Sequence, residues 1–237
     1  MIRIKNIIHF IFPGGLLFVT SCAILYSDAW TRVESAHIDI AGIIILVFGF
    51  FLGWRFDRNR LIYVLALLLI ADVVDRWFVD HSATFSLHHI VTVLVPLNFF
   101  LLAVMKEKGV RKFYSLAQLS LLPVQALLVY LWLTKWNSTH HDLLEVSHLP
   151  GRFASIPDLF IVVFVTALLA QLLRYIRYQN PVETAFVWAI ICASVAGVMV
   201  PGVEPTLLRI FAALIIIISV FEMSYALAYY DELTSLP

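Results

Sequence analysis

The chain has 237 residues, of which 62% are hydrophobic and only 14% are charged, and its formal net charge is zero. Its mean hydropathy is +0.92. Apolar residues in long runs, without the alternation typical of barrel strands, predict an all-α, polytopic membrane helical bundle embedded in a lipid bilayer. The lack of a basic surplus excludes nucleic-acid binding.

Eight apolar stretches follow one another along the chain, most close to the twenty residues that cross a hydrocarbon core of about 30 Å. We predict that Pro13 bends the first helix within its early turns. The predicted transmembrane helices are Ile7–Ser27, Ile38–Trp54, Leu61–Val79, Phe85–Met105, Tyr114–Leu133, Pro157–Tyr178, Pro181–Val200 and Pro205–Tyr230.

The basic residues indicate how the helices cross the membrane. Eleven fall in one alternate set of connections and five in the other, and the richer set faces the cytoplasm in membrane proteins. Both termini are therefore predicted to be cytoplasmic. The richer set is Arg3, Lys5, Arg55, Arg58, Arg60, Lys106, Lys108, Arg111, Lys112, Arg174 and Arg177, and the other is Arg32, Arg76, Lys135, Arg152 and Arg209.

Charged residues interrupt the third predicted helix at membrane depth. Asp72, Asp75 and Arg76 are spaced by three and one, so they form a stripe that must face the bundle because an ionised group in hydrocarbon is costly. The next helix begins with His88 and His89, which we expect at a depth similar to that of Asp75 and Arg76 on an antiparallel neighbour. These five residues are the candidate ligand-binding site.

Two interpretations of this site stay open. Carboxylate, guanidinium and imidazole groups can bind an anion, orient a histidine on a transition metal or haem, or hold a quinone head group. Alternatively, Asp72 and Arg76 form an ion pair that only fixes helix packing, within a satisfied polar network. Four amides elsewhere are expected to bond between helices, and Glu183 to belong to a helix start. The amides are Asn98, Gln118, Gln125 and Gln171.

Seven of the eight histidines are predicted on the outer side. Imidazole is a common ligand of transition metals, and the spacing of His141, Glu145 and His148 would place all three on one face if this loop were helical. An amphipathic helix on the membrane surface would show the same spacing. The candidate metal ligands are His37, His81, His88, His89, His141, Glu145 and His148.

The last seven residues carry the most specific pattern in the chain. Asp231-Glu232-Leu233-Thr234-Ser235-Leu236-Pro237 follows the last apolar helix without a Gly or Pro linker. This segment resembles the Asp-x-Leu-Thr-Gly-Leu-Pro opening of GGDEF diguanylate cyclase domains, with Ser235 in place of the common Gly. The aromatic-rich helix before it resembles the signalling helix that feeds such domains. Residues 1–230 are then similar to a membrane-associated sensor (MASE-like) domain.

The resemblance implies an activity for the parent protein. Two GTP molecules would condense to cyclic di-GMP across a homodimer of cyclase domains with Mg²⁺, in a bacterial inner membrane, in response to a small-molecule or ion signal. Residues 1–237 contain none of that family's catalytic motif, so the chain by itself is expected to be a sensor. A small membrane transporter, a membrane oxidoreductase and a sensor of another output domain remain alternatives.

The homodimer is expected to form along the last helix. Small residues there permit close packing, and four larger side chains are placed at or near the interface. They are Glu222, Tyr225, Tyr229 and Asp231.

Overall fold

The computed structural model describes residues 10–27, 29–77, 84–105, 118–135, 146–147, 156–199 and 203–234. Each of the eight predicted helices has a counterpart among them, and a 3-10 turn, η1 (Ala29–Arg32), follows the first. A two-residue antiparallel pairing joins β1 (Val146–Ser147) to β2 (Ile156–Pro157). The helices are α2 (Gly14–Tyr26), α3 (Ser35–Arg55), α4 (Asn59–Trp77), α5 (Thr84–Val104), α7 (Leu121–Lys135), α8 (Asp158–Tyr178), α9 (Pro181–Val198) and α10 (Val203–Thr234).

Three predicted helices differ from the observed ones, two in continuity and one in length. The first is interrupted by a turn at Phe12 and Pro13, where proline removes a backbone donor, before α2 begins. The fifth is interrupted by a turn at Ser120, directly before α7. The last is longer than predicted, because α10 continues beyond Tyr230 to Thr234 through a sequence that lacks Gly and Pro.

Four of the described helices are long and apolar enough to cross a membrane, and they mark the chain as a membrane protein. The helix α4 is not among them, since it carries Arg60, Asp72, Asp75 and Arg76. The count of eight spans and the cytoplasmic location of the termini stay predictions. The four helical segments are Ser35–Arg55, Leu159–Tyr178, Pro181–Val198 and Val203–Ala226.

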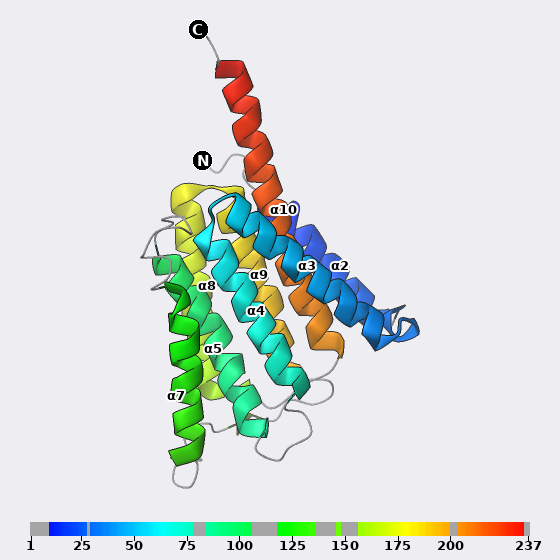
Figure 1. Ribbon diagram of the computed structural model, residues 1–237, viewed down its shortest axis with the longest axis vertical. Helices are drawn as coiled ribbons and strands as arrows, with labels where there is room; N and C mark the ends of the chain where they lie inside the picture. Colours follow the sequence, from blue (N-terminus) through cyan, green and yellow to red (C-terminus); the bar gives the residue numbers. More distant parts are fainter. Residues whose placement is uncertain are drawn as a thin grey trace.

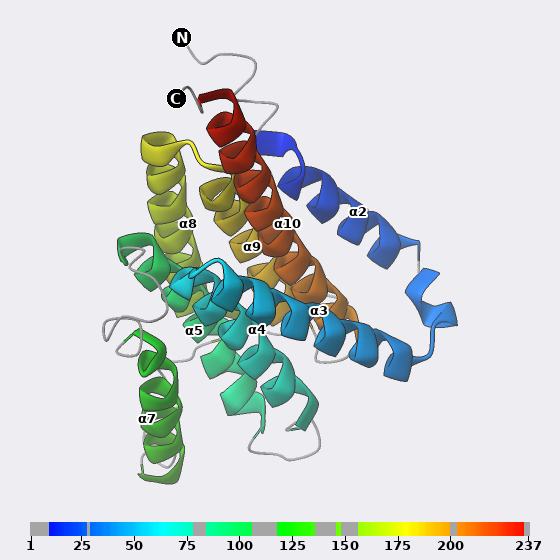
Figure 2. The ribbon, with the colours of Figure 1, turned by 45° about the horizontal axis from the view of Figure 1, so that its top comes forward.

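The helix α9 lies at the centre of the bundle (Figures 1 and 2). It packs against α10, α5, α8 and α2, and its apolar side chains are buried around most of its circumference. By contrast, α3 and α8 each present a row of exposed aliphatic side chains, which suits a lipid-facing position. These include Ile40, Ile44 and Val47 on α3, and Val162, Leu169 and Leu173 on α8.

Two glycines of α3 receive isoleucines of α10 in the same order. A methyl group at Gly42 would lie 3.1 Å from Ile210 Cδ1, and one at Gly49 would lie 2.9 Å from Ile217 Cδ1. The two glycines are seven residues apart, and so are the two isoleucines, so α3 and α10 run in parallel at these contacts. Each isoleucine lies above a position that has no side chain. The glycines therefore allow the two helices to approach closely.

A buried ionic cluster joins four helices at the end of the bundle where α10 ends. The Glu183 carboxylate accepts hydrogen bonds from Arg60 Nη1 at 2.7 Å and from Arg174 Nε at 2.9 Å. Arg174 Nη1 also donates to the backbone oxygens of Ala103 and Met105 at 2.6 and 2.9 Å, which satisfies carbonyls at the C-terminal end of α5. Glu183 thus does more than begin a helix, and Arg60, predicted in a cytoplasmic connection, is buried.

The four amides bond between helices as predicted. Asn98 Nδ2 donates to Gln125 Oε1 at 2.9 Å, and Gln171 Nε2 donates to the backbone oxygen of Phe99 at 2.7 Å. Gln118 accepts a hydrogen bond from Asn59. These contacts attach α7 and α8 to the core of the bundle, because buried amides are stable only when they are hydrogen-bonded.

Candidate functional site

Asp75, on α4, is the centre of a buried charged network. One oxygen of its carboxylate accepts a hydrogen bond from Arg209 Nη2 on α10, and the other lies 3.0 Å from His88 Nδ1 on α5. Asp75, Arg209 and His88 are 6%, 5% and 7% exposed, so the network is withdrawn from both water and lipid. A single carboxylate therefore links three helices.

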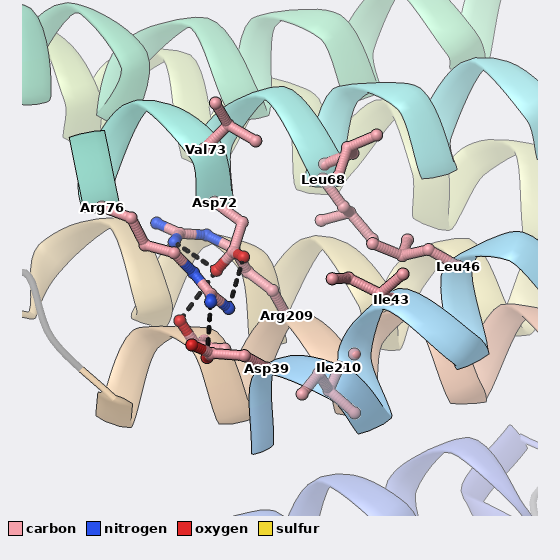
Figure 3. Close-up of a pocket in the computed structure, with 12 residues that line it drawn as sticks. Asp39, Ile43, Leu46, Leu68, Asp72, Val73, Arg76, Arg209 and Ile210 are labelled. Atoms are coloured by element: carbon pink, nitrogen blue, oxygen red, sulfur yellow. Dashed lines mark hydrogen bonds and ion pairs between the residues drawn. The ribbon is translucent and has the colours of Figure 1, made fainter. Parts of the chain in front are cut away.

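Asp72 extends this network by one turn of α4. Its carboxylate accepts a hydrogen bond from Thr206 Oγ1 at 2.8 Å and pairs with Arg76 Nη2 at 2.7 Å. Arg209 Nη1 reaches the same carboxylate at 3.5 Å. Figure 3 shows Arg76 and Asp39 meeting at the edge of the network, where an ion pair joins them. Asp72 and Arg76 thus form the predicted i,i+4 pair as part of a larger cluster.

A cavity of about 210 Å³ lies between α3, α4 and α10 beside these charges. Figure 3 shows that its two ends differ, with the charged groups at one end and Leu46, Leu68, Ile43 and Ile210 at the other. Such a cavity suits a small amphiphilic molecule, or the end of a larger one, because pockets for drug-sized ligands measure roughly 300–1,000 Å³.

His88 is held by its surroundings on one side of the ring only. Nδ1 faces Asp75, whereas Nε2 is buried and has no hydrogen-bond partner among the described residues. The His89 ring is also buried and lies edge-on to His88, with ring centroids 5.8 Å apart. Thr92 Oγ1 donates to the backbone oxygens of His88 and Gly197 at 2.9 and 2.7 Å, which connects this turn of α5 to α9.

Three of the seven predicted metal ligands lie among the described residues, namely His37, His88 and His89. Among the described residues, no group of three or more His, Cys, Asp or Glu side chains is placed to hold a metal ion. His37 is exposed at the start of α3, where it pairs with Glu34 at 3.6 Å. Val146 and Ser147 form β1, so a helix from residue 141 to 148 is not continuous there. His81, His141, Glu145 and His148 lie outside the described residues.

Sequence reasoning found one side of the network and missed the other. It selected Asp72, Asp75, Arg76 and His88, all from two consecutive helices. It did not select Arg209, Thr206 and Asp39, which lie on α10 and α3. Arg209 interrupts an apolar run just as Asp75 does. An ionisable residue within an apolar helix marks a candidate site, so this signal also indicates Arg209.

The residues predicted at a dimer interface lie along the last helix. Tyr225 is 74% exposed on α10, and Glu222 is partly buried one turn earlier. Tyr229 and Asp231 belong to the final turns of the same helix.

Comparison of the chain with family models, with curated proteins and with solved structures finds no match.

We expect Arg209→Leu to destabilise the folded bundle by roughly 3–5 kcal/mol, because it leaves the buried Asp75 carboxylate without its guanidinium partner. Replacement of both Arg209 and Asp75 by Leu should recover most of this loss. Unfolding of the purified protein in mixed lipid–detergent micelles measures the effect. Arg177→Leu removes an exposed arginine from α8 and should change stability by less than about 0.5 kcal/mol. Equal losses of stability in Arg209→Leu and Arg177→Leu would contradict the role of Arg209 as the partner of the buried Asp75 carboxylate.

Proposed function

We propose that this chain is the membrane sensory part of a signalling protein, and that it controls a C-terminal diguanylate cyclase domain. The signal is a small molecule or ion that acts at the charged network around Asp75. Two cyclase domains, brought together in a homodimer, convert GTP to cyclic di-GMP with Mg²⁺. The protein lies in a bacterial inner membrane, with both termini in the cytoplasm.

The continuity of α10 is the observation that carries this proposal. The same helix contains Arg209, in the network, and Asp231 and Thr234, in the segment that resembles a cyclase opening. Its 32 residues span about 48 Å, more than the hydrocarbon core of about 30 Å. Figure 1 shows its final turns projecting beyond the rest of the bundle. A change at Arg209 can therefore reach the output along a single rigid element.

The charged network supports a sensory role because its members come from four helices. Asp39, Asp72, Arg209 and His88 lie on α3, α4, α10 and α5, and each contacts at least one charged or polar partner on another helix. A ligand that competes for any of these contacts changes the packing of α10. Such differential contact is what lets a ligand shift a conformational equilibrium.

The output of the full-length protein in lipid nanodiscs tests the role of the network. We expect Arg76→Leu and Asp75→Asn each to change cyclic di-GMP formation from GTP and Mg²⁺ by about fivefold or more, the lower end of typical coupling between sites. Arg177→Leu is the matched control, with wild-type output. Replacement of Arg76 and Asp39 together by Leu should not restore normal output. Full recovery in that double variant would reduce the pair to a packing role.

Insertions into α10 test the continuity argument directly. One Ala inserted between Tyr230 and Asp231 turns the following segment by about 100° and should change output strongly, whereas seven inserted residues bring it back to within about 20° and should preserve regulation. Both variants keep the sensory residues intact. Equal output from the two insertions would show that α10 does not act as a rigid connection.

Disulfide cross-linking tests the homodimer. In a cysteine-free full-length protein, Tyr225→Cys should cross-link two copies in membranes, since Tyr225 is 74% exposed on α10. Leu173→Cys, 67% exposed on the lipid-facing side of α8, is the control and should stay monomeric on denaturing gels. A cross-link at Leu173 alone would place the interface on α8 and contradict this part of the proposal.

A further inference from the structure

The charges around the cavity do not balance. Among the described residues, the network holds three carboxylates, of Asp39, Asp72 and Asp75, and two guanidiniums, of Arg76 and Arg209. The formal charge of these five groups is −1. Asp39 is the most exposed of the three carboxylates, so a ligand that brings a positive charge can approach it.

The charged end of the cavity offers acceptors for an ammonium group. Asp39 is 41% exposed at its side chain and pairs with one atom of Arg76, and Asp72 is 14% exposed. Thr206 also lines the cavity and donates its hydroxyl hydrogen to Asp72. The two carboxylates come from two helices that line one cavity, and a primary ammonium carries three donors.

The apolar end of the cavity is bordered by the outer surface of the bundle. Ile43, on α3, lines the cavity and is 59% exposed. It belongs to the exposed aliphatic row of α3 that includes Ile40 and Val47. A molecule dissolved in the bilayer can therefore reach the charged end with its apolar part still in contact with hydrocarbon.

We propose that the cavity between α3, α4 and α10 binds a lipophilic primary amine. Its ammonium group donates hydrogen bonds to Asp39 and Asp72, and its apolar body contacts Ile43, Leu46 and Leu68. The amine supplies the positive charge that balances the three described carboxylates against the two guanidiniums. This inference rests on the proposed function only in treating the amine as the signal; binding itself stands on the geometry of the cavity.

Three probes that share one apolar chain and differ in the head group test the ligand class. Hexylamine, hexanol and hexanoate are titrated by calorimetry into the full chain in nanodiscs, with empty nanodiscs as the blank. We expect saturable binding of hexylamine and no binding of hexanoate. Hexanol should bind about tenfold more weakly than hexylamine, because it lacks the charge-assisted contact. Binding of hexanoate or hexanol as tight as that of hexylamine overturns the proposal.

Two variants locate the site. Asp39→Asn keeps a polar side chain beside Arg76 and should weaken hexylamine binding by about tenfold. Its control is Asp57→Asn, the same change at a positive-φ turn residue between α3 and α4 that Asn tolerates. Ile43→Trp fills the cavity from its exposed border without disturbing the core, and should abolish binding. Wild-type affinity in either Asp39→Asn or Ile43→Trp overturns the proposal.

Binding and output together separate the two proposals. If hexylamine binds as expected but leaves cyclic di-GMP formation unchanged, the amine site holds and the proposed function fails. If hexylamine does not bind while Arg76→Leu still changes output, the sensory function holds and the amine assignment is overturned.

Discussion

The carboxylate of Asp75 is shared between a guanidinium from α10 and an imidazole from α5, and the arrangement of the surrounding helices depends on this sharing. In an apolar environment a charge without a partner is costly, so neither helix can turn away from α4 without a large loss of free energy. Asp72 repeats the constraint one turn earlier with Thr206 and Arg76. The positions of three helices are thereby fixed relative to each other near one end of the bundle.

A second constraint acts near the other end of α4. Arg60 lies fifteen residues before Asp75, about 22 Å along the helix axis, and pairs with Glu183 of α9. Apolar packing between helices in lipid is weakly directional, because lipid tails are as apolar as leucine. Two ionic clusters at separate depths therefore specify which turns of α4, α9 and α10 face one another, and the glycine contacts of α3 and the amide bonds of α7 and α8 complete the register.

Features formed by residues close together in the chain could be predicted from the sequence. Long apolar runs located the eight helices of the described residues, and the spacing of Asp72, Asp75 and Arg76 predicted a stripe that faces the bundle, as it does. The partners of that stripe were harder to find. Arg209 lies 134 residues after Asp75, and nothing in periodicity or spacing pairs residues over such a distance. The same holds for Asp39 with Arg76 and for Arg60 with Glu183. Proline explains both helix breaks: Pro13 lies in the first turn, and Pro123 lacks the N–H that would bond to the Leu119 carbonyl directly before the break at Ser120.

The glycine contacts of α3 restrict the kinds of motion available to α10. Ile210 and Ile217 each lie above a glycine, and the matching seven-residue intervals make this fit depend on axial position. A piston-like slide of α10 by one turn, about 5.4 Å, would move Ile210 off Gly42 and towards the side chain of Ile38 or Leu46. A small rotation or tilt leaves both isoleucines near their glycines. These contacts therefore favour torsion or tilt of α10 over axial displacement.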